Sequence, residues 1–321
     1  MKEGCFLILM LFVGIKTYSW GFYAHRLINY NAVFLLPPEM LLLYKKNIAF
    51  LNDHAVDPDK RRYAMVEEGP RHYIDMDHYG PAPYAGLPRK WKDAVSTLTE
   101  DTLKAHGIVP WWIQVMLQRL TTAFREGNQV RILKLSAELG HYIADSHVPL
   151  HASSNHNGQQ TNQRGIHGFW ESRVPELLAE KEWNLVIGRA SYIKNPLDFC
   201  WSRILESASE ADSVLLTERK LSAGFAPDRK YAFETRSGRM VKQYSSEYSI
   251  AYNSLLDDMI ERRLRQSIYA VASFWYTAWV NAGRPDLSKL AGKTLSAAEQ
   301  LEFETMEQQW SREAILGRSC D

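Results

Sequence analysis

The chain is poor in cysteine and has no excess of charge of either sign. It contains 3 cysteines among 321 residues, and its 38 Lys and Arg residues are almost balanced by 37 Asp and Glu residues. A thiolate-based zinc site needs more cysteine than this. Nothing in the charge balance indicates duplex nucleic acid as a partner, because such proteins usually carry a basic excess. Any metal site must therefore use histidine and carboxylate side chains.

Long apolar runs are also scarce. The first residues carry Lys2, then an apolar run from Cys5 to Ile15, and then small residues ending at Ser19, which is the pattern of a secretory signal peptide. The run is too short for an ordinary transmembrane helix, and no later segment approaches the roughly 20 apolar residues that such a helix needs. We predict cleavage after Ser19 and export to the periplasm or the medium, with Trp20 as the new N-terminus. The alternative is an uncleaved anchor.

Removal of this segment would simplify the rest of the composition. The segment carries two lysines and one glutamate, so equal numbers of acidic and basic residues would remain. Cys5 would leave as well, and Cys200 and Cys320 would be the remaining cysteines. These two either form a disulfide in an oxidising compartment or stay free, and both alternatives are open.

Strand-like alternation is almost absent, whereas apolar residues recur at helical spacing in most long segments. The longest such segment runs from Tyr244 to Asn281 without Gly or Pro, and we expect it to form a long helix against the core. There is no internal repeat or low-complexity linker. We therefore predict an all-α protein with a single domain over residues 20–321, which ends in a tail from about residue 284.

Three stretches rich in Gly, Pro or polar residues separate the predicted helices. They run from His78 to Arg89, from Ala152 to Ile166 and from Thr217 to Arg239. Loops of this length in a compact domain tend to be functional or mobile. The second lies between two candidate metal motifs and is the best candidate for a wall of the active site. Pro and Tyr residues of the first either form an apolar rim for a lipid substrate or pack inward.

Two His and carboxylate pairs lie close together in the middle of the chain. His141 and Asp145 stand four residues apart in HYIADSHVPLH, and His151 follows the helix break expected at Pro149. His167 and Glu171 repeat the four-residue spacing in HGFWES. Each pair alone is typical of a surface ion pair. The two pairs together with a third histidine instead suit a catalytic zinc site, which uses imidazole and carboxylate and keeps one position open for water.

Further candidates lie upstream and complete a recognisable set. His72 lies in RHYIDMDHYG, fifteen residues after Asp57 in HAVDPDKRR, and His25 lies five residues after Trp20 in WGFYAH. From Trp20 to Glu171 the chain resembles the superfamily that joins zinc-dependent phospholipases C with single-strand-specific nucleases. The resemblance implies a mostly helical domain with three Zn²⁺ ions in a cleft.

The resemblance also implies a ligand for each zinc. The first zinc would be held by Asp57, His72 and His141, with Asp145 as a bridge to another. The second would be held by His151, His167 and Glu171, and the third by the α-amino nitrogen and carbonyl oxygen of Trp20 together with His25 and Asp145. Asp57 and Asp145 are also the candidate catalytic carboxylates. Asp59 competes with Asp57, but the fifteen-residue step to His72 matches the nuclease branch and favours Asp57.

Such a cluster suits the hydrolysis of phosphate esters. Water shared by two zinc ions loses its proton near neutral pH, and a further zinc stabilises the leaving oxygen. Three Zn²⁺ ions outweigh three ligand carboxylates, so the pocket attracts a phosphodiester although the whole chain is nearly neutral. We predict a zinc-dependent phosphodiesterase that acts as a monomer.

The class of phosphodiester remains open between two branches. The short step from Trp20 to His25 is similar to the nucleases, whereas Glu171 and the short gap from His151 to His167 are similar to the phospholipases. We favour a phospholipase C-like activity on a phospholipid headgroup. The alternatives are a single-strand-specific nuclease or 3′-nucleotidase, and a zinc-binding protein without turnover.

Several other polar residues near these motifs are weaker candidates. Asp75, Asp77, Asn155 and Asn157 are candidates for substrate binding or for orienting ligands, with ordinary loop roles as the alternative. The surplus histidines nearby are more typical of surface or supporting positions than of ligands. They are His78, His147 and His156.

Overall fold

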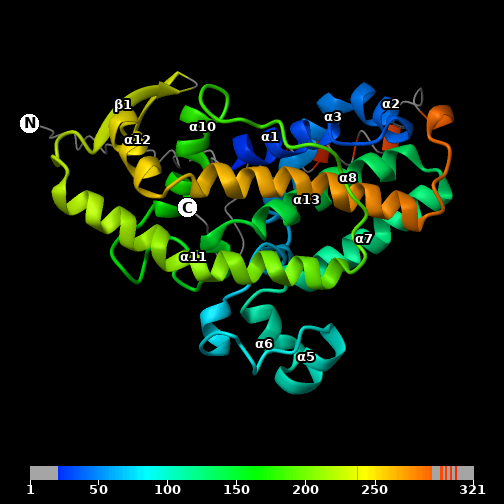
Figure 1. Cartoon of the computed structure of the whole chain (residues 1–321), viewed down its shortest axis with the longest axis horizontal. Helices are drawn as coiled ribbons and strands as arrows, with labels where there is room; N and C mark the ends of the chain where they lie inside the picture. Colours follow the sequence, from blue (N-terminus) through cyan, green and yellow to red (C-terminus); the bar gives the residue numbers. More distant parts are fainter. Residues whose placement is uncertain are drawn as a thin grey trace, which may run out of the picture.

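The computed structural model describes residues 21–236 and 238–290, and also residues 297–298, 301, 304–305 and 308. Helices dominate this part of the chain, which confirms the all-α prediction (Figure 1). The first half contains α1 (Phe22–Val33), α2 (Pro38–Lys46), α3 (Ile48–Asp53), α4 (Asp57–Arg61), α5 (Trp91–Leu98), α6 (Glu100–Ala105), α7 (Val109–Glu126) and α8 (Gln129–Asp145). The second half contains α9 (Ile166–Gly168), α10 (Val174–Leu178), α11 (Pro196–Gly224), β1 (Tyr231–Arg236), β2 (Arg239–Tyr244), α12 (Ser246–Leu255) and α13 (Met259–Asn281).

Short tight helical turns connect several of these helices. Those of the 3₁₀ type are η1 (His54–Val56), η2 (Val66–Arg71), η3 (Met76–Tyr79), η4 (Pro149–Ala152) and η6 (Ser288–Leu290). A π-helical turn, η5 (Phe169–Arg173), joins α9 to α10. Such turns are common at functional sites, and η5 carries one of the predicted ligands, Glu171.

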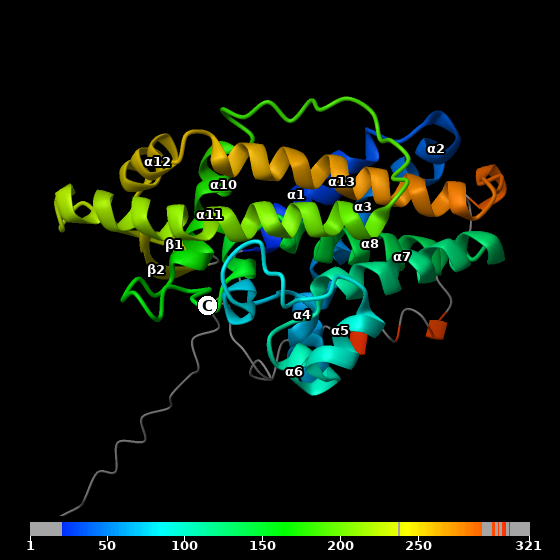
Figure 2. The same cartoon turned by 60° about the horizontal axis from the view of Figure 1, so that its bottom comes forward.

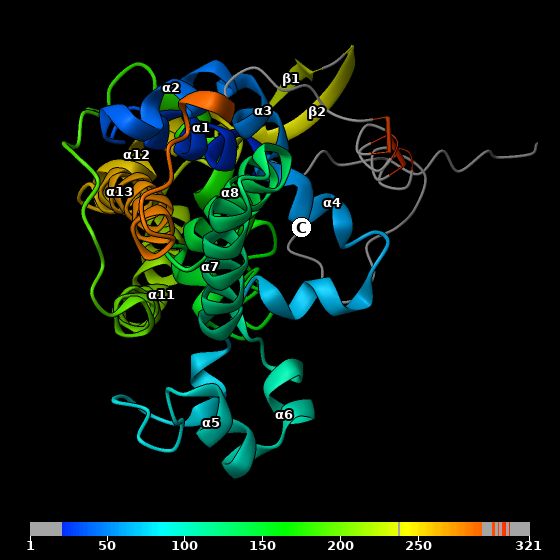
Figure 3. The ribbon, with the colours of Figure 1, turned by 90° about the vertical axis from the view of Figure 1, so that its right-hand side faces the viewer.

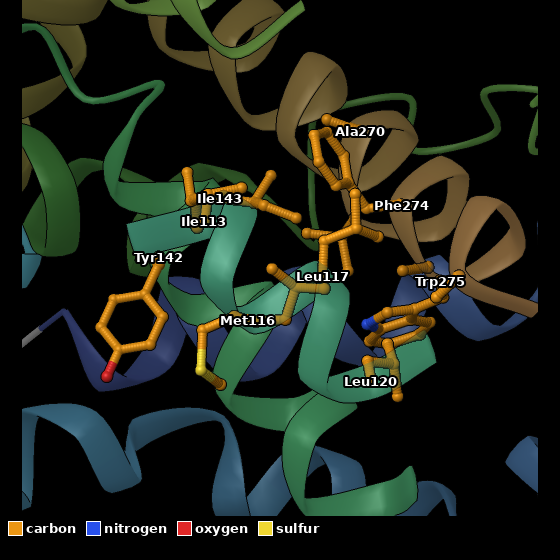
Figure 4. Close-up of a cluster of buried hydrophobic side chains, with 14 of the residues drawn as sticks. Ile113, Met116, Leu117, Leu120, Tyr142, Ile143, Ala270, Phe274 and Trp275 are labelled. Atoms are coloured by element: carbon orange, nitrogen blue, oxygen red, sulfur yellow. The ribbon is translucent and has the colours of Figure 1, made fainter. Parts of the chain in front are cut away.

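The central layer is formed by long helices. Helices α11 and α13 run side by side in opposite directions, and α7, α8 and α1 pack against them (Figures 1 and 2). The bundle is filled by apolar side chains from α7, α8 and α13 (Figure 4). Trp275 of α13 is fully buried there, and its indole Nε1 donates a hydrogen bond to the carbonyl of Ser136 at 2.9 Å. This packing makes α8 a rigid support for the polar residues at its C-terminal end.

Local signals set the junctions between these helices. Gly127 ends α7 in the left-handed conformation at φ 62°, and the side chain of Asn128 then caps α8 by accepting from the N–H of Arg131 at 3.1 Å. Asn195 and Ser245 cap α11 and α12 in the same way. Helices α5 and α6 project from one side of the bundle (Figure 3).

Two segments differ from the expectations. The predicted long helix from Tyr244 to Asn281 is divided into α12 and α13, because Asp257 and Asp258 adopt positive φ angles of 50° and 56°. Aspartate tolerates this conformation better than most residues, so the break needs neither Gly nor Pro. The predicted loop from Thr217 to Arg239 begins as the last turns of α11 and ends in the antiparallel hairpin of β1 and β2.

The tail expected from residue 284 is packed against the core as far as Leu290. Leu287 and Leu290 are buried, and the indole of Trp279 donates to the carbonyl of Pro285 at 3.0 Å. No helix among the described residues is both long and apolar enough to cross a membrane. The predicted signal segment and Cys320 lie outside the described residues, whereas Cys200 is buried with a free thiol.

Candidate metal centre

The site is built where α1 crosses α8. Gly140 allows this crossing, because a Cβ at this position would lie 2.0 Å from Oδ1 of Asn29 on α1. The amide of Asn29 also donates to the carbonyls of Leu51 and Ala137, which ties α1 to α3 and α8. As a result the ring of His25 stacks on the ring of His141, with centroids 3.9 Å apart.

Asp145, at the end of α8, is the centre of the cluster. Its Oδ1 lies 3.3 Å from Nε2 of His25 and 3.8 Å from Nε2 of His151. Its Oδ2 lies 3.0 Å from Nδ1 of His72 and 3.4 Å from Nε2 of His141. The side chain is 1% exposed. One buried carboxylate therefore faces two pairs of histidines, one pair with each oxygen.

Glu171 forms a second centre on η5. Its Oε2 lies 2.7 Å from Nε2 of His167 and 3.6 Å from Nε2 of His151. Its Oε1 lies 3.3 Å from Nε2 of His25. His25 thus connects the two centres, because it contacts both Asp145 and Glu171. The loop from Ala152 to Ile166 leads into this part of the site.

The centre around Asp145 includes the carboxylate of Asp59 and not that of Asp57. Oδ1 of Asp59 lies 3.7 Å from Nδ1 of His72 and 3.6 Å from Nε2 of His141. The carboxylate of Asp57 instead contacts Nδ1 of His54 at 2.6 Å and Nζ of Lys60 at 3.9 Å. The choice of Asp57 from its spacing to His72 therefore does not match the placement of the side chains.

The reason for this difference lies in the short helix α4. Residues two apart on a helix point in different directions, so only one of the two aspartates can face His72 and His141. Asp57 begins α4, and its carboxylate contacts neighbours on the same part of the chain. Asp59, one residue after Pro58, faces the interior ligands.

Three of the histidines are oriented by the backbone. Nδ1 of His141 hydrogen-bonds the carbonyl of Ala55 at 2.9 Å, and Nδ1 of His151 hydrogen-bonds that of His72 at 2.7 Å. Nδ1 of His167 contacts the carbonyl of His156 at 3.1 Å. A carbonyl accepts only, so each Nδ1 donates this hydrogen bond, and each Nε2 is the nitrogen that faces the carboxylates. This is the arrangement in which a histidine binds metal through Nε2.

His72 is turned the other way, and a residue missed by sequence reasoning explains its orientation. Its Nδ1 faces the site, whereas its Nε2 lies 3.5 Å from Oε1 of Glu68. Glu68 is fully buried and accepts from the hydroxyl of Tyr142 and from Nη1 of Arg71, the latter at 2.6 Å. It stands four residues before His72 in EEGPRH, a spacing that a helical reading of that segment would have indicated.

The carboxylates and imidazoles change each other's protonation. Burial alone raises the pKa of Asp145, but the surrounding histidines outweigh it and hold the pKa well below its usual range. Glu171 behaves in the same way, chiefly through His167. Burial lowers the pKa of His25, but its contacts with the two carboxylates raise it to about 10. Burial and the nearby His25 lower the pKa of His141 to about 4. The carboxylates are thus ionised at neutral pH, and His141 is neutral.

The remaining polar candidates have supporting contacts. Asp77 accepts hydrogen bonds from the N–H and the hydroxyl of Ser154, which joins η3 to the loop after η4. Oδ1 of Asn157 accepts from the N–H groups of Gly165 and His167 and so holds the start of α9. His147 donates from Nδ1 to the carbonyl of Ile143.

Asp75 and Asn155 have local partners as well. Oδ2 of Asp75 lies 3.7 Å from Nδ1 of His106, and His78 stacks on the ring of His106. Asn155 donates to the hydroxyl of Thr161 and accepts from the N–H of Gln160 within its own loop. These contacts give Asn155 a role in shaping the loop.

Trp20 lies outside the described residues, so its role as a ligand stays a prediction. Gly21, which follows it, lies against the second centre, because a Cβ on Gly21 would be 2.7 Å from Oε1 of Glu171.

The geometry fits bound zinc. Zn–N and Zn–O bonds of about 2.0–2.2 Å place two ligand atoms of one tetrahedral ion about 3.3 Å apart. The separations between donor atoms in both centres scatter around this value, from 2.7 to 3.8 Å. Three groups of donors lie close enough to share an ion. They are His25 with His141 and Asp145, Asp59 with His72 and His141, and His151 with His167 and Glu171.

Fold and site together define a class: a helical protein with a buried cluster of histidines and carboxylates suited to more than one zinc ion. The chain belongs to the zinc-dependent phospholipase C family, because the model of that family matches residues 24–214. The matched segment contains every described ligand candidate, from His25 to Glu171. None of the curated proteins matches the chain.

Proposed function

We propose that this protein is a phospholipase C-like phosphodiesterase that uses three zinc ions. Asp59 replaces Asp57 in the ligand set and holds the first zinc with His72 and His141. The second zinc is held by His151, His167 and Glu171, and the third by His25 with the N-terminal Trp20. Asp145 bridges two of the ions. The observation that carries this proposal is the position of Asp145, whose two oxygens face different pairs of histidines.

The chain's own residues would prepare the site for a phosphate ester. The ionised carboxylates and neutral His141 keep their lone pairs available for metal at neutral pH. Zinc bound there would act as a Lewis acid on the phosphoryl oxygens and make water nucleophilic near neutral pH. Asp145 is then the central catalytic carboxylate, because it orients both sides of the site through one rigid helix end. Asp57 is proposed instead as a support that contacts His54.

A phospholipid is the favoured substrate. Membership of the zinc-dependent phospholipase C family supports it. A nuclease would need accessible aromatic rings beside the metal for base stacking. Tyr142 and Trp170 are next to ligands in the sequence, but both are buried. In the loop from His78 to Arg89, Tyr79 and Tyr84 pack partly against the core, whereas Pro81 and Pro83 are exposed.

A parallel assay tests this proposal. Purified protein beginning at Trp20 is given phosphatidylcholine, single-stranded DNA, RNA or a 3′-nucleotide, each with and without a chelator. We expect chelator-sensitive release of phosphocholine that returns when zinc is added. Preferential cleavage of nucleic acid would support the nuclease alternative, and zinc binding without any hydrolysis would support a non-catalytic zinc protein. An Asp145→Asn variant serves as the inactive control.

The proposed Trp20 ligand has a separate test. A free α-amino group binds metal only when deprotonated, and it exists at Trp20 only after cleavage. Protein with one extra residue before Trp20 should bind fewer zinc ions and lose most of its activity. Full activity with three tightly bound ions in that extended protein would exclude the N-terminal ligand.

A further inference from the structure

The hairpin of β1 and β2 exposes large apolar side chains on one face and places ion pairs on the other. In its register Phe233 lies opposite Lys242, Thr235 opposite Met240 and Tyr231 opposite Tyr244, so these six side chains share one face. We call this the outer face of the hairpin. Phe233 is 70% exposed and Met240 is 74% exposed. Water therefore covers Phe233 and Met240, whereas the Tyr244 end of this face is packed against Phe169.

The opposite face is half-buried and carries Ala232 and Val241 together with the polar side chains that attach the hairpin to the protein. Glu234 pairs with the guanidinium of Arg173 and accepts from the amide of Gln243 at 2.8 Å. Arg236 pairs with Glu176 at 3.1 Å. An antiparallel sheet with one solvated face normally turns its apolar side chains inward. Here ion pairs help to hold the hairpin in place, and the largest exposed apolar side chains, Phe233 and Met240, lie on the other face.

The hairpin is attached to the element that carries Glu171. Arg173 lies two residues after Glu171 on η5 and also donates from Nε to the carbonyl of Tyr244 at 3.0 Å. The ring of Phe169 on the same turn stacks on Tyr244, with centroids 3.9 Å apart. Figures 1 and 3 show the hairpin at an edge of the molecule, on the opposite side from α5 and α6.

We propose that the outer face of the hairpin docks on the surface of a phospholipid bilayer and brings the metal site to its substrate. The inference rests on the proposed phospholipid substrate. Phe233 and Met240 supply apolar side chains that can enter the acyl boundary, and Tyr231 supplies an aromatic ring suited to the headgroup level. The ammonium of Lys242 lies 4.2 Å from the centre of the Tyr231 ring. A cation at this position complements the phosphates of the headgroups.

The size of this face favours a bilayer over a protein partner. Six residues per strand make a face about 20 Å long, and two strands about 5 Å apart make it narrow. This gives an area of a few hundred Å² at most. A stable protein interface buries about 800 Å² per partner. Two inserted side chains need no such area, because a bilayer surrounds each of them.

The experiment compares two physical forms of one substrate. Hydrolysis is measured on dispersed short-chain phosphatidylcholine below its critical micelle concentration, and on vesicles of long-chain phosphatidylcholine and phosphatidylserine in a 4:1 ratio. Flotation of the same vesicles gives a second readout, which measures binding and does not depend on hydrolysis. The test variant combines Phe233→Ser with Met240→Ser. Val186→Ser is the matched control, because Val186 is a large apolar residue that is 83% exposed elsewhere on the chain.

We expect the double variant to lose at least about tenfold in vesicle binding and vesicle hydrolysis, since burying each side chain is worth more than a tenfold change in affinity. Its kcat/KM on dispersed substrate should stay unchanged, and Val186→Ser should change neither. Lys242→Ala should weaken binding about fivefold on vesicles with phosphatidylserine and little on vesicles without it.

Three results would overturn the docking proposal. One is unchanged vesicle binding in the double variant, and another is an equal loss on dispersed and vesicle substrates. The third is a difference in oligomeric state between the wild type and the double variant, measured by light scattering. That result would assign the face to a second copy of the chain. Wild-type protein that floats with vesicles but hydrolyses neither form of phosphatidylcholine would contradict the proposed function while supporting the docking.

Discussion

The two sides of the candidate metal centre are built on different kinds of backbone. Asp145 and His141 lie in the last turn of a long, packed helix, and their neighbour Gly140 allows α1 to approach closely. His167 lies on the short turn α9 and Glu171 on the π-helical turn η5 that follows it, and the loop from Ala152 to Ile166 precedes both. We call these the α8 side and the η5 side. The α8 side is packed into the larger core of the bundle. The η5 side is packed into a second, smaller core and is attached further by hydrogen bonds and ion pairs.

This difference indicates which side of the site can adjust when a side chain is substituted. A packed helix cannot shift one ligand without disturbing the bundle, because protein interiors are as dense as organic crystals. The η5 side is held by its smaller core and also by polar contacts of Asn157, of Arg173 with the hairpin, and of Glu218, whose carboxylate accepts from Gln163. It should adjust locally when one of these contacts is lost.

The largest effect on activity and zinc content is expected when the central carboxylate of each side is replaced by an amide, one side at a time. Asp145→Asn should lower kcat/KM by more than about 100-fold and reduce binding of more than one zinc. The loss of a residue that only supports a metal ligand already lowers activity or metal affinity by about 10-fold to 100-fold, and a direct ligand should matter more. Glu171→Gln should remove one zinc and leave the others bound. Zinc content by elemental analysis, with circular dichroism as the folding control, checks both. Equal zinc loss in the two variants would remove the distinction between the sides.

A second prediction concerns the choice between two aspartates on the α8 side. Asp59→Asn should reduce chelator-sensitive activity by about 100-fold, since its carboxylate faces His72 and His141. Asp57→Asn should cost less than about tenfold, because it removes only contacts with His54 and Lys60. Steady-state kinetics at matched zinc concentration measures both. The reverse order would restore Asp57 as the ligand.

A third prediction tests how His72 is oriented. Glu68→Gln should weaken zinc binding on the α8 side by about 10-fold to 100-fold, as expected for a carboxylate behind a metal-bound histidine. Competition with a calibrated chelator gives the affinity. Arg61 contacts both Glu68 and Glu138. Glu138→Gln is the control, because Glu138 has no described contact with His72. A similar loss in the control would indicate general weakening of the network.

The smallest effect is expected on the η5 side, at Glu218. Burial raises the pKa of this carboxyl, but hydrogen bonds from Lys230, Gln163 and Tyr248 outweigh it and lower the pKa below its ordinary value of 4.5. Its contribution to stability is therefore present above pH 4.5 and is lost as the pH falls through the lower folded pKa.

Urea unfolding of the wild type and of Glu218→Gln measures this contribution. The variant should be less stable by about 1 kcal/mol at pH 7, and the difference should shrink below pH 4.5. A difference that is independent of pH would show that the charge of Glu218 does not matter. Loss of zinc in this variant would contradict the expected local adjustment.

The helical fold and the two His and carboxylate pairs could be predicted from the sequence, because helical spacing is a local property. The spacing of four between His141 and Asp145, and between His167 and Glu171, requires each pair to share a helix face. Scarce cysteine requires that a metal site use these residues. The same kind of periodicity could not reveal the break at Asp257 and Asp258, because aspartate adopts their positive φ angles without the Gly or Pro that marks a break in a sequence.

What the sequence by itself determined is the helical class of the fold, the kinds of ligand candidate, and the four-residue spacing of the two His and carboxylate pairs. These follow from composition and from the helical repeat. Only the tertiary structure placed Asp59, and not Asp57, beside His72 and His141, directed Nε2 of His72 toward Glu68, and left Phe233 and Met240 exposed. Each of these depends on which side chains from distant segments meet in space. A short helix presents Asp57 and Asp59 in different directions, and only the surrounding fold determines which direction faces the histidines.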